Sequence, residues 1–119
     1  MRYVLYAGAH PGTEFVDALR RAGREVCAVA SLADAQKALR TEPPAVAVLD
    51  MGLDAAALRE ALISLLMIDA RVHAAVVTDM APDVFEDAME GLGVLLPLPP
   101  DPGAAGAQAL LCALEALKS

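Results

Sequence analysis

The chain has 119 residues, of which 57% are hydrophobic and 21% are charged, so it can bury the core of one domain but is too short for two. Nine basic and sixteen acidic residues give a net charge of −7, which repels nucleic-acid backbones and anionic lipid surfaces. Only 3% of the residues are aromatic and Trp is absent, so bases have no stacking platform. We therefore expect a single domain, residues 1–119, that binds neither nucleic acid nor membranes.

The apolar segments are short. The longest, Ala61 to Ile68, falls far below the roughly 18 residues that a membrane-spanning helix needs. The stretch from Val4 to Ala9 is too short for the apolar region of a secretory signal peptide, so we expect a cytoplasmic protein. Cys27 and Cys112 lie in apolar settings without a CxxC pair, which predicts two buried thiols rather than a disulfide or a metal site.

Apolar runs alternate with amphipathic runs five times, which is the pattern of an α/β domain with a parallel sheet. Each apolar run is rich in Val or Leu and nearly free of charge, as expected of strands covered on both faces. The predicted strands are Tyr3 to Ala7, Val26 to Ala30, Ala45 to Leu49, Val72 to Thr78 and Val94 to Leu98. His73 then lies inside the fourth strand, in the core or on a face of the sheet.

Each amphipathic run carries signals for the start and end of a helix. Ser31 with Asp34 three residues later makes a weakened capping box, Pro82 suits a first turn, and Gly23 and Gly91 suit C-terminal caps. The expected starts are Thr13 or His10, Ser31, Asp54, Pro82 and the residues after Pro102-Gly103. The expected ends are Gly23, Glu42, Asp69, Gly91 and a residue close to Ser119.

Strict alternation with right-handed crossovers leaves few topologies, and the commonest is a doubly wound, three-layer sheet in the strand order 2-1-3-4-5. Pro97 supports this order. It falls within the fifth predicted strand, where a missing N–H is tolerated only at a sheet edge, and strand five is an edge in that order.

In open α/β sheets, ligands bind beyond the carboxyl ends of the strands. The ends here carry Gly8, Ala9, His10, Asp50, Thr78, Asp79, Leu98 and Pro99. Over essentially the whole chain this arrangement resembles the receiver domain of two-component response regulators, which is a flavodoxin-like fold. The resemblance implies that Asp50 holds the phosphoacceptor position and Thr78 the switch hydroxyl. It also places Leu98-Pro99 where the family has a Lys-Pro pair whose peptide bond is commonly cis, so we expect the Leu98–Pro99 bond to be cis.

The sequence departs from that family at the residues that handle charge. Receivers bind Mg²⁺ through an acidic pair after the first strand, where this chain has Gly8 and Ala9, neither of which offers a carboxylate oxygen. Leu98 cannot neutralise a phosphoryl group as Lys does. Because electrostatic stabilisation is nearly the whole of phosphoryl-transfer catalysis, we expect no ordinary phosphorylation of Asp50.

The resulting prediction is a stand-alone, atypical receiver-like domain that acts in signal transduction or regulation through protein contacts. It is expected to be no enzyme and to use no cofactor or metal. Asp50 itself is open to a plainer interpretation, as a carboxylate that caps a loop amide or faces solvent.

Three alternatives stay open. The loop from Gly8 to Thr13 resembles the phosphate-binding loop of flavodoxins, which predicts an anion- or nucleotide-binding protein. Its candidate ligand residues are Gly8, Ala9, His10, Gly12 and Thr13. In a second alternative, Asp50 is a true phosphoacceptor with a rearranged metal site. In a third, His10, Asp50 and Asp79 meet and bind a transition metal.

Two predicted helices carry unusual surfaces. The fourth directs Val84, Phe85, Ala88 and Met89 toward the core, and its outward residues, Asp83, Glu86, Asp87 and Glu90, are all acidic. The fifth is apolar almost all round, although packing on a sheet needs a stripe of only about 100°. Its small residues Ala105, Ala109, Ala113 and Ala116 would let another helix approach. These surfaces predict a protein partner or a homodimer.

Overall fold

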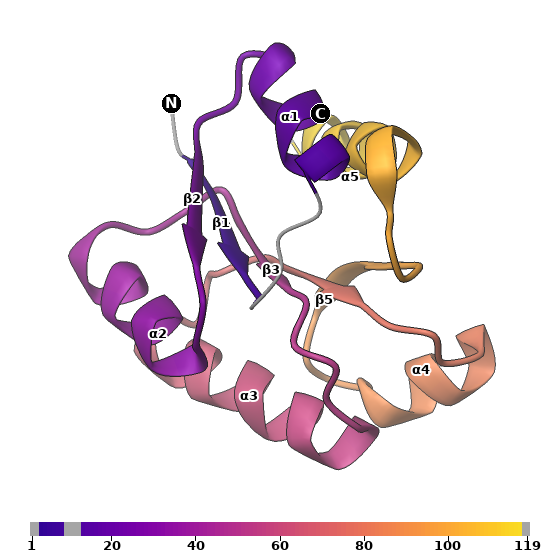
Figure 1. The fold of residues 1–119 in the computed structure, drawn as a ribbon. Helices are drawn as coiled ribbons and strands as arrows, with labels where there is room; N and C mark the ends of the chain where they lie inside the picture. Colours follow the sequence, from indigo (N-terminus) through magenta and orange to yellow (C-terminus); the bar gives the residue numbers. More distant parts are fainter. Residues whose placement is uncertain (1–2, 9–12, 118–119) are drawn as a thin grey trace.

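The computed structural model describes residues 3–8 and 13–117, and within them strands and helices alternate strictly (Figure 1). The strands are β1 (Val4–Ala7), β2 (Val26–Val29), β3 (Val46–Leu49), β4 (Ala74–Val77) and β5 (Val94–Leu98). The helices are α1 (Thr13–Arg21), α2 (Leu32–Thr41), α3 (Ala55–Ile68), α4 (Pro82–Ala88) and α5 (Gly103–Leu117). The element order predicted from the sequence is confirmed.

The five strands form one parallel sheet in the order β2-β1-β3-β4-β5, which confirms the predicted fold class and topology. β2 and β5 are therefore the two edges. Pro97 lies in β5 opposite Val76, and the missing N–H costs no ladder bond on the open side of an edge strand.

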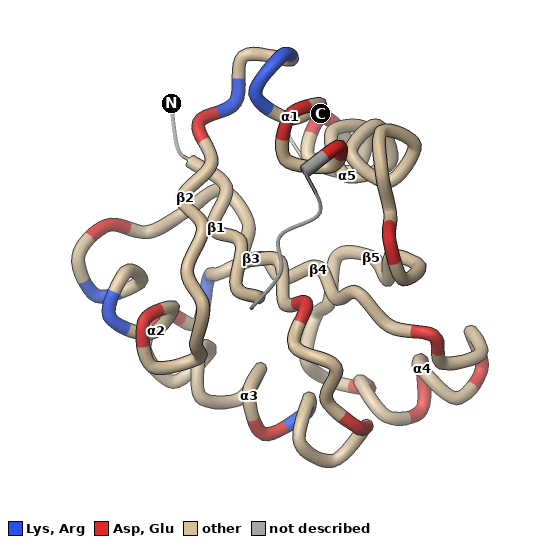
Figure 2. Tube along the Cα trace, viewed as in Figure 1, with Lys and Arg blue, Asp and Glu red and all other residues tan. Residues whose placement is uncertain are grey.

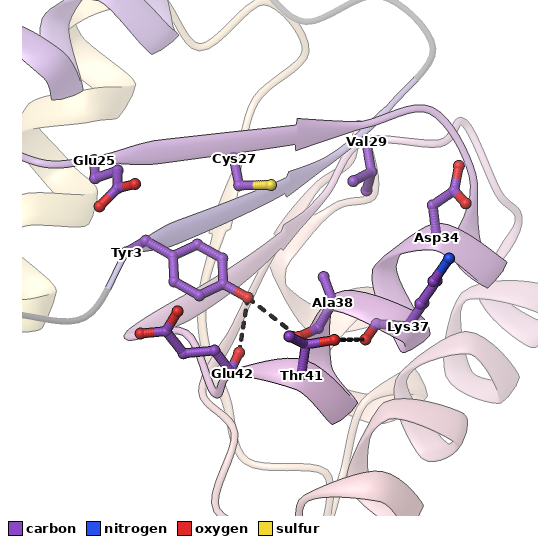
Figure 3. Close-up of a pocket in the computed structure, with 9 residues that line it drawn as sticks. All are labelled: Tyr3, Glu25, Cys27, Val29, Asp34, Lys37, Ala38, Thr41 and Glu42. Carbon is purple, nitrogen blue, oxygen red and sulfur yellow. Dashed lines mark hydrogen bonds between the residues drawn. The ribbon is translucent and has the colours of Figure 1, made fainter.

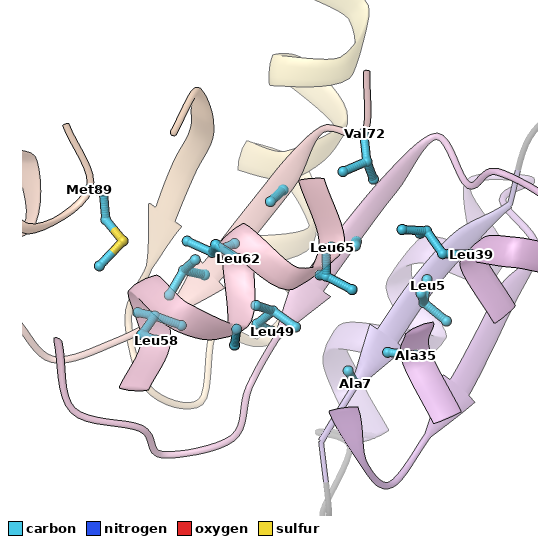
Figure 4. Packing of buried hydrophobic residues seen from close by; sticks show 14 of the residues in the cluster. Leu5, Ala7, Ala35, Leu39, Leu49, Leu58, Leu62, Leu65, Val72 and Met89 are labelled. Carbon is cyan, nitrogen blue, oxygen red and sulfur yellow. The ribbon is translucent and has the colours of Figure 1, made fainter. Parts of the chain in front are cut away.

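Helices cover both faces of the sheet, as Figure 1 shows. On one face, α2, α3 and α4 bury a cluster that includes Leu5, Leu49 and Leu65, all within 1% of complete burial (Figure 4). On the other face, α1 and α5 bury Val4, Tyr6 and other residues of the central strands. Each large apolar side chain buried in this way contributes about 1.5–3 kcal/mol to folding.

Helix starts follow the predicted signals. The Ser31 hydroxyl accepts from the Asp34 N–H at 3.1 Å, and the Asp54 carboxylate accepts from the Ala57 N–H at 2.8 Å. Pro82 begins α4. The predicted end at Gly91 is wrong, because α4 ends at Ala88 with Met89 as its C-cap, and Gly91, with a φ of 83°, lies two residues further on. Of the two predicted starts of the first helix, α1 begins at Thr13, whereas His10 lies outside the described residues.

Four further expectations about individual residues are wrong. Cys27 and Cys112 are exposed, because β2 is an edge strand and Cys112 lies on the outer side of α5. β4 begins at Ala74, so His73 precedes the strand and is exposed. Val84 is 51% exposed, since the short α4 buries only Phe85 and the adjoining Met89. Among the described residues no peptide bond is cis, so the Leu98–Pro99 bond is trans.

The outer side of α5 is apolar, as predicted. Ala105, Ala109 and Ala116 are exposed there and Ala113 is half-buried. The Leu117 side chain is 47% exposed. No helix within the described part of the chain is both long and apolar enough to cross a membrane.

Candidate functional site

The carboxyl ends of β3 and β4 form a cleft of about 250 Å³. Two of the residues predicted for the site, Asp50 and Thr78, line this cleft, and Asp79 lies beside them. The remaining lining residues are Gly52, Leu53, Val77 and Pro100. The parallel topology thus brings together the acid and the hydroxyl that are 28 positions apart in the sequence.

Asp50 is half-buried and bonded on both its backbone and its side chain. Its N–H donates to the Ala7 carbonyl at 2.8 Å, which fixes the residue at the end of β3. Its carboxylate accepts a hydrogen bond from the hydroxyl of Tyr6. Asp50 is therefore not a simple solvent-facing acid, and among residues 3–8 and 13–117 no loop amide donates to its carboxylate.

Tyr6 was not among the predicted site residues. Its side chain is fully buried in β1, and its ring centroid lies 5.9 Å from that of Phe15, with the planes tilted by 51°. A buried tyrosine hydroxyl needs a hydrogen-bond partner, and an apolar strand offers none among its side chains. That requirement is the sequence signal that could have linked Tyr6 to a polar group at a neighbouring strand end.

Gly8 is held closely against Asp50. Its N–H donates to the Val29 carbonyl at 2.9 Å, which fixes the backbone. A Cβ atom at this position would lie 2.6 Å from the carbonyl oxygen of Asp50 and 3.0 Å from the Tyr6 ring. The backbone at position 8 therefore leaves no room for any side chain.

Most of the candidate ligand loop lies outside the described residues. Ala9, His10 and Gly12 belong to that part, so the flavodoxin-like loop and the metal set containing His10 stay predictions. Within residues 3–8 and 13–117, no group of three or more His, Cys, Asp and Glu residues could hold a metal ion.

Thr78 lines the cleft as expected from its sequence position, whereas Leu98 does not. The Thr78 hydroxyl accepts from the Met80 N–H at 3.2 Å, within its own loop. Leu98 is 2% exposed and packs into the core that α1 and α5 cover, so its side chain does not line the cleft. Pro99 is exposed, and Pro100 lines the cleft instead.

The predicted acidic face is present on α4 and just beyond its end. Asp83, Glu86, Asp87 and Glu90 are all exposed, and Figure 2 shows acidic positions without basic ones along this helix. Arg59 of α3 donates to the carbonyl oxygens of Ala88 at 2.8 Å and Glu90 at 3.2 Å. These bonds satisfy carbonyl groups at the C-terminal end of α4 and tie it to α3.

A second concavity, the β2–α2 groove, has a volume of about 440 Å³ (Figure 3). Its lining residues are Tyr3, Glu25, Cys27, Val29, Asp34, Lys37, Ala38, Thr41 and Glu42. The Tyr3 hydroxyl donates to the Glu42 carbonyl at 2.8 Å and lies 3.4 Å from that of Ala38. Burial raises the pKa of Tyr3, and the nearby Cys27 and Glu42 raise it further.

The raised pKa of Tyr3 predicts a loss of stability in alkali. The folded state holds the phenolic proton of Tyr3 more tightly than the unfolded state does. The stabilisation from this difference is fully present below the pKa of about 10 that Tyr3 has in the unfolded chain, and it is lost as the pH rises through the higher pKa of the folded state. Urea unfolding of the wild type and Tyr3→Phe between about pH 8 and about pH 12 measures this. As the pH rises, the free energy of unfolding of the wild type should fall more than that of Tyr3→Phe. An equal fall in both proteins would contradict the assignment of the effect to Tyr3.

The comparisons with known proteins concern the fold of this chain. No family model matches the sequence and no curated protein matches it. A two-component response regulator from Legionella pneumophila is 17% identical, with a TM-score of 0.73 over 98% of this chain and 99% of that one. A LuxR-family response regulator from Aurantimonas sp. SI85-9A1 is 22% identical, with a TM-score of 0.76 over 98% of this chain and 86% of that one.

A third similar structure is the pilus assembly protein CpaE from Caulobacter crescentus CB15. It is 18% identical, with a TM-score of 0.73 over 98% of this chain and 99% of that one. At such identities the likeness concerns the fold. This chain therefore has the flavodoxin-like receiver fold, with Asp50 and Thr78 at the ends of β3 and β4.

Proposed function

We propose that this chain is a non-enzymatic, receiver-like regulatory domain that acts through protein contacts and not through Mg²⁺-dependent phosphorylation of Asp50. The observation that carries the proposal is the contact of Tyr6 and Gly8 with Asp50. One carboxylate oxygen already accepts a hydrogen bond from a buried hydroxyl. The backbone beside it excludes the side chain that would have to supply a second carboxylate.

The residues present do not fit Mg²⁺. This ion needs near-octahedral oxygen coordination, usually with one or two carboxylates in addition to water. Asp50 and Asp79 are the described carboxylates that line the cleft, and the first is engaged by Tyr6. Neither Gly8 nor Ala9 carries a side-chain oxygen.

A phosphoryl group on Asp50 would also lack a cation to pair with. Leu98 occupies the position that the resemblance assigns to the family's Lys. Its side chain is buried in the core between the sheet and helices α1 and α5. The described residues that line the cleft include no Lys, Arg or His. Transfer of a phosphoryl group depends on charge neutralisation, so the reaction would be slow at best.

Protein contacts are the remaining route to a regulatory role. The exposed acidic face formed by Asp83, Glu86, Asp87 and Glu90 suits a basic partner, and the apolar outer side of α5 suits a helix of a partner or of a second copy. One of the structurally similar proteins, CpaE, is a pilus assembly protein, and a role in assembly would also depend on protein contacts.

Intact-mass spectrometry after incubation with acetyl phosphate and Mg²⁺ tests the proposal. The wild-type mass should stay unchanged under conditions that phosphorylate a working receiver run in parallel. The matched control is Asp50→Asn, which keeps the size of the side chain. A phosphoryl adduct in the wild type that Asp50→Asn abolishes would overturn the proposal and favour a phosphoacceptor with a rearranged metal site.

A further inference from the structure

The outer edge of the sheet at β2 presents backbone groups without a partner strand. Among the residues that the structure describes, β2 pairs only with β1, and the Glu25 and Val29 carbonyls accept from the N–H groups of Val4 and Gly8. Backbone groups of successive residues in a strand point to opposite sides. Those of Val26 and Ala28 therefore point away from β1, toward the open edge.

Only one of these outward groups is covered by a side chain in the described part of the chain. Arg20 lies 3.5 Å from the Val26 carbonyl oxygen, at the limit of a hydrogen bond. The Ala28 N–H and carbonyl carry no such cover. Natural edge strands are commonly protected by charged residues or Pro, and β2, with the sequence Val-Cys-Ala-Val, has neither.

The β2–α2 groove runs beside this open edge. The side chains of Glu25, Cys27 and Val29 point from β2 into it, opposite Ala38 of α2 (Figure 3). Every second side chain of a strand added to β2 would therefore point to the same side of the sheet as Cys27 and Val29. Those side chains would contact the apolar surface formed by Cys27, Val29 and Ala38. Backbone bonds with alternating pockets are the requirements of strand-addition binding.

The charges around the groove indicate which segment would bind. Glu25, Asp34 and Glu42 are exposed there, against the single Lys37, so its rim is acidic. A second copy would bring an equally acidic rim to the edge and would add the repulsion of two chains of net charge −7. A segment that carries Lys or Arg complements the rim instead.

We infer that the edge of β2 binds an extended segment of a partner protein, which adds as a sixth strand, places apolar side chains over Cys27 and Val29, and sets basic side chains against the acidic rim. This inference deepens the proposed function by naming one contact surface. It requires neither Mg²⁺ nor a phosphoryl donor, so an adduct at Asp50 would leave it untouched.

Fluorescence anisotropy with the labelled peptide Arg-Val-Thr-Val-Thr-Val-Arg tests the inference. The wild type should bind it, and more weakly as salt is added. Ala28→Pro removes the outward N–H and should weaken binding about tenfold, whereas Ala28→Val, which keeps that N–H, should change it less than about twofold. Glu25→Lys should weaken binding about fivefold and reduce its salt dependence.

Circular dichroism establishes that each variant is folded. If Ala28→Pro unfolds, NMR of the wild type tests the binding site instead. A strand bound at the edge of β2 must shift the amide resonances of both Val26 and Ala28 when the peptide is added. The inference is overturned if the peptide does not bind, if a peptide with Glu in place of both Arg residues binds equally well, or if the shifted resonances lie elsewhere. A wild-type dimer that Ala28→Pro converts to monomer would also overturn it, in favour of a second copy.

Discussion

Gly8→Asp should lower the free energy of unfolding by about 3 kcal/mol and should not create a Mg²⁺ site. The substitution introduces an acid at the position where the resemblance to receiver domains implies one. Its Cβ would lie 2.6 Å from the carbonyl oxygen of Asp50, which is backbone and cannot rotate away. Either β1 or the loop after β3 must move, at the expense of the bonds that Gly8 and Asp50 donate to Val29 and Ala7.

The matched control is Gly52→Asp, in the loop that follows Asp50. A Cβ there meets nothing within 4 Å, although the φ of 64° is a conformation that Asp adopts at a small penalty. We expect this control to lose only about 1 kcal/mol. Urea unfolding measures both variants, and calorimetric titration measures Mg²⁺. Equal stability of Gly8→Asp and the wild type would show that the space beside Asp50 is not closed.

Tyr6→Phe should lower the free energy of unfolding by about 2 kcal/mol at neutral pH, because the Asp50 carboxylate loses a hydrogen bond from a buried hydroxyl. The ring and its packing on Phe15 are retained. The loss therefore reports on the hydroxyl rather than on a cavity.

Tyr3→Phe is the matched control at neutral pH. The Tyr3 hydroxyl donates to a neutral backbone carbonyl, so its loss should amount to about 1 kcal/mol. Urea unfolding of Tyr6→Phe, Asp50→Asn and the double variant gives the coupling energy of the pair. A double variant whose loss is the sum of the two single losses would show that Tyr6 and Asp50 do not interact.

Much of the fold can be predicted from the sequence, because the signals that specify it are local. The Val- and Leu-rich runs, the caps at Ser31 and Asp54, and Pro82 define elements whose order admits few topologies. Edges are harder to place. The apolar neighbours of Cys27 indicate a core residue, but Cys27 is exposed because no described residues form a strand beyond β2.

The candidate site is predictable only in part. Asp50 and Thr78 follow from strand ends and topology, and both line the cleft. Two contacts depend on how closely β1 and β3 are spaced at their carboxyl ends. These are the hydrogen bond from Tyr6 to Asp50 and the approach of Gly8 to the Asp50 carbonyl. Such distances are set by tertiary packing, and the sequence indicates only that a buried Tyr6 hydroxyl needs some polar partner. The burial of Leu98 is likewise decided by the core beneath α5.

Titration with beryllofluoride and Mg²⁺, monitored through the backbone amide resonances of Asp50 and Thr78, tests most directly whether the cleft lacks the chemistry of a phosphoacceptor. Beryllofluoride mimics a phosphoryl group on a carboxylate and needs the same neutralising charges. The account predicts that both resonances stay in place at saturating concentrations. A saturable shift of both, absent in Asp50→Asn, would contradict it.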